Sequence, residues 1–556
     1  MKHNPDYQDR ILEIHGPNMF NMFHVERAIN FAQKHDLNGL IFHCNELLDR
    51  LVLPSKYFSK RDSLANWPVR DATLMNNQYY MHGVLKKCKE AGLNFYAEVK
   101  EIYYPQEILE LFPWLRKPNG AVCPTDPFWW EFLEEKVREF VELFPDIAGI
   151  VVSPGTRESM VSLAANRCTC ERCKHYDVDQ WYRELIEAMY RPLKKAGKRL
   201  VVRDFSYTSD HQFAMVEAAR EVSEDITMAL KKAPHDYYPT FPDNPAVGKC
   251  GGMRQWIEFD TWGQYFGLGV FPCSIAEDMQ GRLQRYLEKG ASGVMLRTDW
   301  EIISQGSVFN SFNLLNLVAG AALSSDVHTD LNEIYRKWVA EGLYSPLIHD
   351  SFYQEPCIPT APNAPEILQE LMKRSWQIQE KIDYVRGHVF QENVQVFDSY
   401  EVAVDMMIHF HCRDDWDPGA SAKVKPTKEN LNIIFAEKDE GVALAESLRG
   451  LVKPEELGVT EEIKKYLDFM LDMYILYANI MRHQAHTVFL TEKALESKGK
   501  DDIQAAMKTL VGYEEEAEAL NRAVKGKAYS NEIEWCLDGD RLLRFKKDVA
   551  CRLESI

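Results

Sequence analysis

The stretch WYRELIEAMYRPLKKAGKRLVVRDFSY (181–207) contains both kinds of element that decide the fold. Its first part, 181–198, repeats apolar residues at helical spacing. Its second part, 199–207, is a short apolar run that ends in charged and aromatic residues. A helix followed by such a run predicts one unit of an α/β fold with a parallel sheet.

The same unit recurs through roughly the first 300 residues. Eight short apolar runs, most of them separated by helical patterns, lie at 10–16, 37–44, 93–101, 147–154, 199–207, 226–233, 255–262 and 293–301. Strands that alternate with helices pair in parallel through right-handed crossovers. Eight such units predict a (β/α)8 TIM barrel. The alternative is a doubly wound sheet, but no glycine-rich phosphate-binding turn follows the first run.

After residue 322 the strand signal fades and long helical patterns follow, among them 331–343, 364–385, 461–497 and 502–524. We therefore predict a catalytic barrel over 1–322 and a mainly α-helical C-terminal domain over 323–556. No flexible linker separates the two parts, so we expect them to pack firmly. The irregular segment 409–430, rich in Gly, Pro and Asp, predicts either a lid over the barrel mouth or a connection between helices.

Composition excludes some classes of protein. The chain has 556 residues and a net charge of −19, whereas nonspecific nucleic-acid binding needs a basic face. A transmembrane helix needs about 18 consecutive apolar residues, and no such run occurs, so we expect no membrane partner. The N-terminal MKHNPDYQDR does not resemble a secretory signal, which favours a cytoplasmic enzyme.

Most of the 12 cysteines are scattered singly, but NRCTCERCKH (166–175) places Cys168, Cys170 and Cys173 within six residues, followed by His175. Thiolates this close together bind zinc, and a fourth ligand would be His175 or a distant residue. Three thiolates leave little Lewis acidity, so we predict a structural zinc that fixes a loop after the fourth strand, and no cofactor for catalysis. The alternative is three reduced cysteines or a disulfide.

Polar side chains follow several of the predicted strands, where a barrel places its active site. They include Glu98, Glu158, Arg203, Asp236, Glu258, Asp260, Arg297, Asp299 and Glu301. Paired carboxylates at strand ends indicate glycoside hydrolysis, in which one acid protonates the leaving oxygen and a second group activates water or attacks carbon. Trp262, Tyr237 and Tyr238 are candidates for stacking on sugar rings, with core packing as the alternative.

Four segments resemble the α-glucuronidases of glycoside hydrolase family 67. They are GIVVSPGTRES (149–159), RLVVRDFSY (199–207), PHDYYPTFPDNPAVG (234–248) and QWIEFDTWGQYFG (255–267). The resemblance implies that Glu158 is the general acid, that Asp236 is the catalytic base, and that Arg203 binds the carboxylate of a uronic acid. It covers predicted strands four to seven well and the helical domain loosely. The family's N-terminal β-sandwich is absent, so this chain resembles a divergent member.

Two features depart from the family pattern. The residue before Tyr265 is a Glu in the family, the second member of its base pair, whereas here it is the neutral Gln264. The family's Lys shortly before the acid has no counterpart. Arg157 either replaces that Lys as a two-pronged carboxylate clamp or forms an ion pair with its neighbour Glu158.

The resemblance therefore implies an inverting glycosidase that acts on a uronic-acid-containing or related oligosaccharide. Further candidates for substrate contacts are Arg157, Gln264, Glu258, Asp260, Trp262, Tyr237 and Asp299. The alternatives are a glycosidase with a different sugar specificity and a non-catalytic carbohydrate-binding barrel that has lost its second base. The helical C-terminal domain is also a candidate surface for forming a homo-oligomer.

Overall fold

A computed structural model of the chain describes residues 4–303, 306–347, 355–388, 393–409, 413–527 and 531–555. Eight parallel strands form a closed barrel in sequence order, and β8 pairs with β1. The strands are β1 Asp9–His15, β2 Gly39–His43, β3 Asn94–Val99, β4 Gly149–Val152, β5 Arg199–Arg203, β6 Thr227–Lys231, β7 Arg254–Asp260 and β8 Gly293–Arg297. The predicted barrel is confirmed, and each strand lies within its predicted apolar run, except that β1 and β7 begin one residue earlier.

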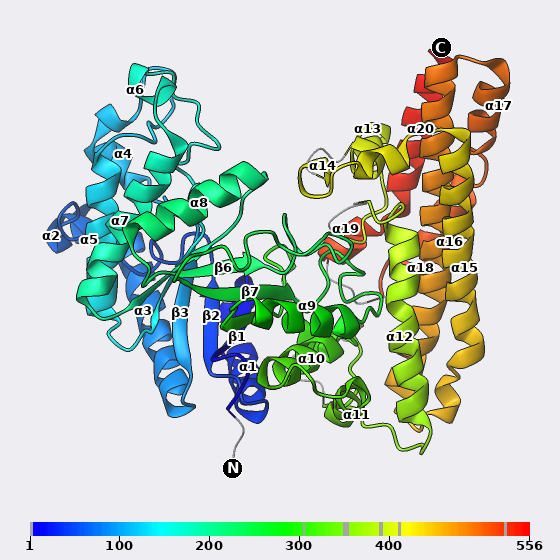
Figure 1. The fold of residues 1–556 in the computed structure, drawn as a ribbon, viewed down its shortest axis with the longest axis horizontal. Coiled ribbons are helices and arrows are strands. Elements are labelled where there is room, and N and C mark those ends of the chain that lie inside the picture. The colour runs from blue at the N-terminus through cyan, green and yellow to red at the C-terminus, as the bar shows by residue number, and fades with distance from the viewer. Residues whose placement is uncertain are drawn as a thin grey trace.

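Helices cover the outer face of the barrel (Figure 1). They are α1 Met22–Lys34, α3 Pro68–Glu90, α5 Phe128–Leu143, α7 Val178–Lys195, α8 Ser209–Val222, α9 Ala276–Glu288 and α10 Leu314–Ser325. The connection between β6 and β7, residues 232–253, all of them described, contains no helix. Its prolines, Pro234, Pro239, Pro242 and Pro245, lack the backbone N–H that a helix interior needs.

The barrel interior changes from apolar to charged toward the carboxyl ends of the strands. The apolar layer consists of Ile11, Ile41, Tyr96, Val151, Val201, Ala229, Trp256 and Met295. Two residues further along each strand, on the same face, lie Glu13, His43, Glu98, Ser153, Arg203, Lys231, Glu258 and Arg297. All eight of these polar residues are buried. We call them the polar ring; it separates the apolar layer from the barrel mouth.

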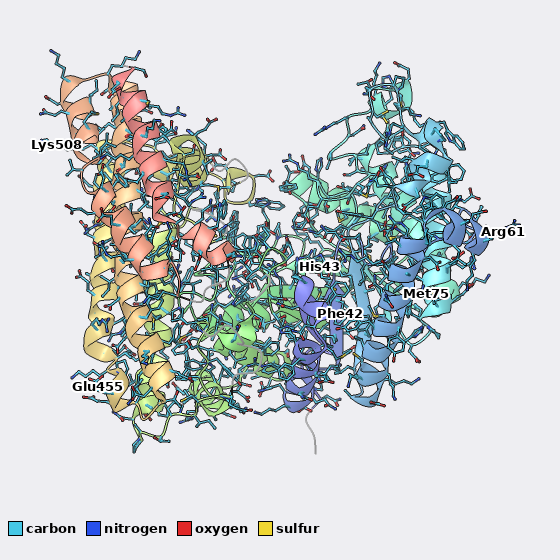
Figure 2. The ribbon with its side chains drawn as sticks, turned by 180° about the vertical axis from the view of Figure 1, so that it is seen from behind. Phe42, His43, Arg61, Met75, Glu455 and Lys508 are labelled. Atoms are coloured by element: carbon cyan, nitrogen blue, oxygen red, sulfur yellow. The ribbon has the colours of Figure 1, made fainter. Side chains whose placement is uncertain are left out.

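The C-terminal part is helical, as predicted, and most of its helices stand beside the barrel (Figure 1). They are α11 Leu331–Glu341, α12 Ala364–Asp383, α15 Lys428–Leu451, α16 Glu461–Ser497, α17 Lys500–Lys508, α18 Tyr513–Val524, α19 Asn531–Cys536 and α20 Gly539–Glu554. Glu455 and Lys508 mark opposite ends of this bundle in Figure 2. Among the described residues, no helix is long and apolar enough to cross a bilayer. The domain border at 322 falls inside α10, and its placement stays a prediction.

The loop after β7 joins the two parts. Phe271 stacks on two tyrosines of α16, with its ring centre 5.1 Å from that of Tyr474 and 4.6 Å from that of Tyr477. The hydroxyl of Tyr384, just after α12, donates to the backbone oxygen of Tyr265 at 2.6 Å. These contacts fix the loop that begins at the end of β7, and the two parts pack together as expected.

Segment 409–430 is more regular than the predicted loop, although 410–412 lie outside the described residues. It contains α14 Arg413–Trp416, a 3-10 turn at Ala420–Val424 and the start of α15. Arg413 donates to the backbone oxygen of Thr240 at 2.9 Å, and Asp415 accepts from the backbone of Ser209 at 2.6 Å. The segment thus rests on the barrel loops after β5 and β6.

Candidate active site

A cavity of about 580 Å³ lies at the carboxyl ends of the strands, directly above the polar ring. The strand ends and the loops after them contribute His15, Lys100, Glu158, Arg203, Asp236, Gln264, Arg297 and Glu301. The C-terminal part contributes Asn393, Gln395, Val402 and Met406. The structure therefore brings Glu158 and Asp236, the two carboxylates expected to act in catalysis, to the wall of one cavity.

Glu158 lies on the loop after β4 and is held from both its backbone and its side chain. The hydroxyl of Tyr103 donates to its backbone oxygen at 2.6 Å. Its Oε2 accepts from Asn45 at 3.3 Å and from the Nζ of Lys100, a residue that is only 1% exposed. Lys100 follows β3, so the cation beside Glu158 comes from the neighbouring strand.

Arg157 does not pair with Glu158 among the described residues. Its guanidinium carbon lies 4.9 Å from the ring centre of Tyr207, and its side chain is exposed. Arg157 is absent from the described lining of the cavity. A contact between Arg157 and substrate stays a prediction.

Asp236 follows β6 in the left-handed backbone conformation, with φ of 70°, and so does His235, with φ of 54°. This turn places the Asp236 carboxylate beside the Nζ of Lys231, with which it forms an ion pair. Burial alone would raise the pKa of Asp236, but the charges of Lys231, His235 and Arg203 hold it well below its usual range. Asp236 is therefore ionised at neutral pH.

The ring of Phe205, just after β5, lies against both Lys100 and Lys231. The Nζ atom of Lys231 is 3.9 Å from the ring centre, and that of Lys100 is 4.7 Å from it. Cations are attracted to the face of an aromatic ring, so Phe205 stabilises the two ammonium groups that contact the candidate carboxylates.

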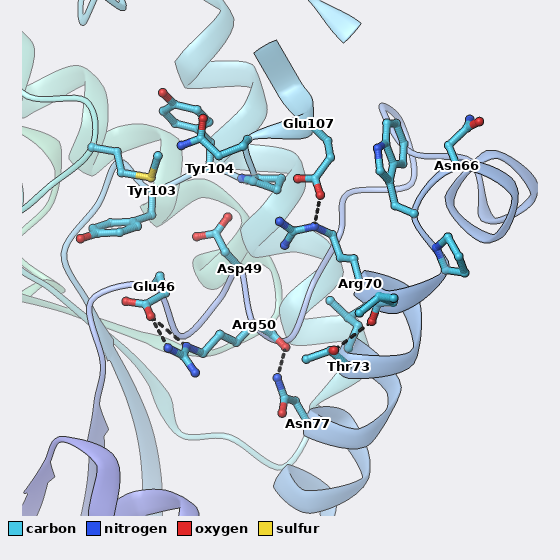
Figure 3. A pocket seen from close by; sticks show the side chains of 17 residues that line it. Glu46, Asp49, Arg50, Asn66, Arg70, Thr73, Asn77, Tyr103, Tyr104 and Glu107 are labelled. Carbon is cyan, nitrogen blue, oxygen red and sulfur yellow. Dashed lines mark hydrogen bonds and ion pairs between the residues drawn. The ribbon is translucent and has the colours of Figure 1, made fainter. Parts of the chain in front are cut away.

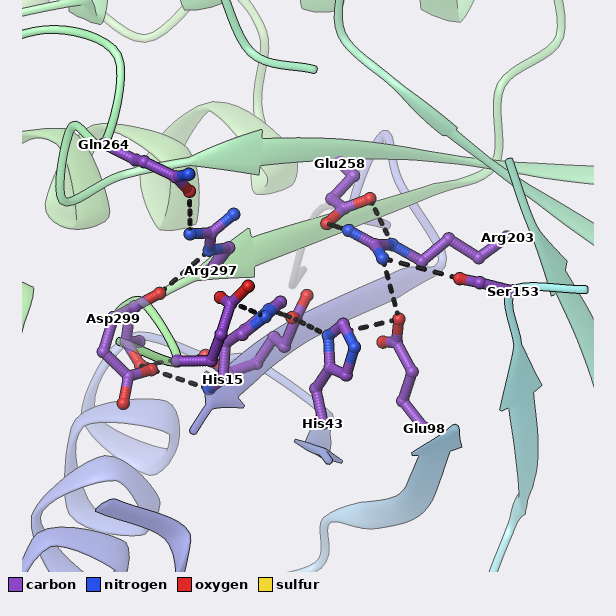
Figure 4. Close-up of polar contacts among 12 residues, drawn as sticks. His15, His43, Glu98, Ser153, Arg203, Glu258, Gln264, Arg297 and Asp299 are labelled. Carbon is purple, nitrogen blue, oxygen red and sulfur yellow. Dashed lines mark hydrogen bonds and ion pairs between the residues drawn. The ribbon is translucent and has the colours of Figure 1, made fainter. Parts of the chain in front are cut away.

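Arg203 is held by Glu258 through two hydrogen bonds (Figure 4), from Nε to Oε2 at 2.8 Å and from Nη2 to Oε1 at 2.6 Å. The hydroxyl of Tyr237 accepts from Nη2 at 2.8 Å and donates to Glu258. Burial alone would raise the pKa of Glu258, but the Arg203 charge and its hydrogen bonds hold it at about 2. Glu258 is absent from the cavity lining, whereas Arg203 and Tyr237 line it.

Glu98 behaves in the opposite way. Burial raises the pKa of Glu98 to about 8, because the nearby charges of Glu13 and Glu258 add to the effect and Arg203 only partly opposes it. Its Oε1 lies 3.2 Å from Nη1 of Arg203 and 3.3 Å from Nδ1 of His43. Glu98 therefore carries a proton at neutral pH, which limits the negative charge of the polar ring.

Asp260 supports the loop that carries Gln264. Its carboxylate accepts backbone hydrogen bonds from Trp262 at 3.0 Å, from Gly263 at 3.2 Å and from Gln264 at 2.6 Å. The amide oxygen of Gln264 in turn accepts from Nη2 of Arg297, at the end of β8 (Figure 4). Gln264 and Arg297 line the cavity, whereas Asp260 lies beneath the loop and is absent from the lining.

Asp299 anchors the loop after β1. It accepts from the backbone of His15 at 2.6 Å and from Asn18 at 3.0 Å, and it is absent from the cavity lining. His15 instead lines the cavity between two carboxylates, 2.7 Å from Glu13 and 2.7 Å from Glu301. Burial alone would lower the pKa of His15, but the two carboxylates raise it.

Trp262 belongs to the packed interior. Its indole fills the space above two glycines, since a Cβ atom on Gly269 would lie 2.0 Å from Nε1 and one on Gly306 would lie 2.6 Å from Cζ2. It is absent from the cavity lining, so stacking of Trp262 on a sugar stays a prediction. The aromatic residues that do line the cavity are Phe205, Tyr207, Tyr237, Tyr238, Tyr265 and Trp300.

Several lining residues were not singled out as site residues by sequence. Lys100, His15 and Arg297 all stand at strand ends, and this position was the available signal. For the lining residues of the C-terminal part, such as Asn393 and Met406, the sequence contains no signal.

A second cavity, of about 910 Å³ (Figure 3), lies beside the loop that carries Glu158, because Met160 of that loop lines it. Tyr103 and Met160 form part of its wall, and Tyr103 also donates to the Glu158 backbone. Two pairs of its polar side chains bond to each other: Arg50 donates to Glu46 at 2.9 Å, and Arg70 donates to Glu107 at 2.5 Å.

The three cysteines of the predicted metal cluster come together in the structure. The fourth ligand atom within 4.8 Å of all of them is the sulfur of Cys123 rather than a nitrogen of His175.

Comparisons with known proteins show what this fold is similar to. No family model matches the chain, and no curated protein gives a significant match. Among solved structures, the chain is similar to a family GH138 enzyme targeting pectin rhamnogalacturonan II, with a TM-score of 0.64 and 13% identity over 99% of this chain and 83% of that chain. This match extends over both the barrel and the helical part, and at this identity it concerns the fold alone.

Two weaker matches are also glycosidases. One is an O-GlcNAc hydrolase mutant from Thermobaculum terrenum, with a TM-score of 0.43 and 11% identity over 98% of this chain and 94% of that chain. The other is a GH20 exo-β-N-acetylglucosaminidase from Vibrio harveyi, with a TM-score of 0.40 and 13% identity over 61% of this chain and 57% of that chain. None of these three structures is a family 67 α-glucuronidase, so that resemblance stays a prediction.

Proposed function

We propose that this protein is a glycoside hydrolase that cleaves an oligosaccharide carrying a uronic acid in the cavity at the barrel mouth. The observation that supports this proposal is the pair of carboxylates, Glu158 and Asp236, on the wall of one cavity lined with aromatic rings. Two carboxyl groups that flank the scissile bond are the usual catalytic pair of glycosidases. The fold shared with the GH138 enzyme agrees with this function but does not by itself determine it.

Asp236 suits the role of base because Lys231 keeps it ionised. In the proposed reaction, Asp236 takes a proton from a water molecule whose oxygen attacks the anomeric carbon. The bond from that carbon to the leaving oxygen breaks, and Glu158 transfers its proton to the leaving oxygen. The configuration at the anomeric carbon is inverted, and the two carboxyl groups are then about 6.5–9.5 Å apart in the substrate complex.

Glu158 has to carry a proton for this role, yet Lys100 donates to its Oε2. In the proposed mechanism the bound substrate displaces this contact and takes over the ammonium group of Lys100. Glu158, released from Lys100, takes up a proton from solvent water and presents the protonated oxygen to the leaving group. Tyr103 keeps the backbone of Glu158 in place during this exchange.

Arg297 is our candidate for binding the substrate carboxylate. Arg203, which the resemblance assigns to this role, already binds Glu258 through two nitrogens. The hydrogen bonds of Arg297 to described residues go to two neutral oxygens, the backbone oxygen of Asp299 and the amide oxygen of Gln264. The carboxylates of Asp260, Glu301 and Glu13 act on Arg297 electrostatically, but none of them accepts one of its described hydrogen bonds, so the charged guanidinium can still bind an anion in the cavity. A neutral residue at 264 preserves this charge, which a Glu would neutralise.

The second cavity is our candidate for the leaving-group side of the substrate. Glu158 protonates the leaving oxygen, so the rest of the leaving group extends from Glu158 away from the cleaved sugar. Met160 and Tyr103 place the second cavity next to the loop of Glu158. Its volume of about 910 Å³ is large enough for further sugar units.

Incubation with uronic-acid-containing oligosaccharides, their neutral counterparts and a panel of aryl glycosides tests the proposal. We expect release of a sugar from the uronic-acid substrates by the wild type and none by Glu158→Ala. Turnover of neutral substrates alone would indicate a glycosidase of different specificity. Tight binding without turnover of any glycoside would indicate a carbohydrate-binding barrel instead. The anomeric configuration of the first product, followed by proton NMR, distinguishes inversion from retention.

A further inference from the structure

Four cysteine sulfurs converge at the edge of the barrel mouth, where two long connections meet. Cys123 lies between β3 and α5, and the other three lie between β4 and α7. We call Cys123, Cys168, Cys170 and Cys173 the four-cysteine cluster; each Sγ atom lies within 4.8 Å of the other three. Cys123 stands 47 positions before Cys170, so spacing in the sequence gives no indication that they meet.

The distances between the sulfurs match a metal site and not a disulfide. The Sγ atom of Cys123 lies 3.7 Å from that of Cys170 and 3.5 Å from that of Cys173. A zinc ion bound to four thiolates at about 2.3 Å sets tetrahedral neighbours about 3.8 Å apart. The sulfurs of a disulfide lie only about 2.0 Å apart. We propose that the four-cysteine cluster binds one zinc ion as a tetrathiolate site.

Groups around the cluster suit a bound zinc tetrathiolate, which carries a net charge of −2. The Oγ1 atom of Thr125 lies 3.4 Å from Sγ of Cys123 and 3.3 Å from Sγ of Cys173, so its hydroxyl is placed to donate to a thiolate. Arg172, inside the cluster's own segment, donates to the backbone oxygen of Thr125 at 3.0 Å. Such surrounding groups orient metal ligands and reduce the cost of their charge.

The backbone next to Cys123 is held independently of any metal. Trp129 donates to the backbone oxygen of Cys123 at 2.9 Å, and Trp181 donates to that of Pro124, also at 2.9 Å. These two indoles, from α5 and α7, fix one side of the site before the ion binds. The segment with the other three cysteines contains only the four-residue helix α6, Glu171–Lys174. The ion would therefore tie a less regular loop to a rigid one.

This tie has a consequence for the candidate active site. The loop that the zinc would fix is the same β4–α7 connection that carries Glu158. Between the two connections, Asn119 also donates to the backbone oxygen of Arg167 at 3.1 Å. We infer that the zinc acts structurally and holds the Glu158 loop against the β3–α5 connection. Metal binding itself does not depend on the proposed glycosidase activity, whereas the effect on catalysis does.

Elemental analysis of the full-length protein, purified under reducing conditions without chelators, tests the site. We expect roughly one zinc per chain in the wild type and in the control Cys551→Ser, which changes an exposed cysteine on α20. Cys123→Ser and Cys173→Ser should each lower the zinc content at least several-fold. Replacement of zinc by Co²⁺ should give the intense thiolate charge-transfer absorption of a tetrahedral site. Zinc contents equal in the cluster variants and the control would overturn the proposal, as would iron in place of zinc.

Thiol titration and hydrogen exchange test the site without relying on the cysteine variants. If the cluster variants do not fold, thiol titration of the wild type before and after chelation remains decisive. An increase of four reactive thiols after metal removal supports the site. A count that stays two thiols too low in metal-free protein indicates a disulfide and overturns the site. Hydrogen exchange should become faster in residues 153–177 after zinc removal and remain unchanged in α20. Unchanged exchange in residues 153–177 would overturn the structural role of the metal.

Discussion

Arg297 and Gln264 form a hydrogen bond across the candidate active site, from a guanidinium on β8 to a neutral amide on the loop after β7. This bond orients the guanidinium without neutralising it. A carboxylate at 264 would instead form an ion pair with Arg297 and compete with an anionic substrate. The family 67 resemblance places a catalytic Glu at this position. If residue 264 is a lost base, Gln264→Glu should improve catalysis. If its neutral amide keeps Arg297 available to an anionic substrate, Gln264→Glu should weaken substrate binding.

We expect Gln264→Glu to raise KM for a uronic-acid substrate about tenfold or more, with a much smaller change for a matched neutral glycoside. Steady-state kinetics on the two substrates measures this difference. Arg297→Gln should produce the same selectivity, because it also leaves no positive charge to bind the carboxylate of the substrate. A variant Gln264→Glu with a higher kcat and an unchanged KM would show that 264 is a base position and would contradict the role of Arg297.

Substrates with different leaving groups distinguish the catalytic roles of Glu158 and Asp236. Glu158→Gln should lower kcat about 10²–10⁴-fold on a natural oligosaccharide but far less on a glycosyl fluoride, which leaves without protonation. Asp236→Asn should lower kcat on both, because water must still be activated. Glu142→Gln, on the exposed side of α5, is the matched control. Equal losses on both substrates for Glu158→Gln would rule out its role as the general acid.

Lys231 should set the pH dependence of the base. The Lys231 charge is the main factor that lowers the pKa of Asp236 against the effect of burial. We expect Lys231→Met to move the acidic limb of the kcat/KM profile to higher pH, because Asp236 then binds a proton more readily. Circular dichroism checks that the variant is folded. If the profile of the folded variant overlays that of the wild type, Asp236 is not the base.

The barrel was predictable from sequence for a physical reason. Each strand is buried on both faces and flanked by helices, so it appears as a short apolar run with a polar end, as 199–207 illustrates. The β6–β7 connection has no helix because its prolines prevent one, and their spacing was visible in the sequence. Strand alternation also explains why the polar ring follows the apolar layer two residues later.

The pairings within the site were not predictable in the same way. Lys100 and Glu158 lie 58 positions apart and come from different strand ends, so nothing local in the sequence links them. Arg157 was the nearest cation to Glu158 in sequence, yet its side chain lies over Tyr207. Asp260 and Asp299 had the residue type and position of catalytic groups, but backbone N–H groups bind their carboxylates. Only the three-dimensional arrangement distinguishes such loop anchors from residues that line the cavity.

The proposed role of the second cavity in binding the leaving group gives a prediction that depends on substrate length. Arg70 lines the second cavity and is partly exposed, with Glu107 as its ion-pair partner. We expect Arg70→Ala to raise KM for a long oligosaccharide several-fold and to leave KM for a small aryl glycoside unchanged. Arg138→Ala, a partly exposed change on α5 that is not in the lining of the cavity, is the control. Equal effects on the long and the short substrate would show that the second cavity does not bind the leaving group.

Glu98 gives a prediction for stability that is independent of activity. Its pKa rises from an ordinary value of 4.5 to about 8 on folding, so the folded state holds this proton more tightly than the unfolded state. The resulting stability is fully present below the unfolded value and is lost as the pH rises through the folded value. We expect the Tm of the wild type to fall between the two pKa values of Glu98, from about pH 4.5 to about pH 8, and Glu98→Gln, which copies the protonated form, to lose less over that range. The same decline in Glu98→Gln and in the wild type would show that Glu98 does not titrate in this interval.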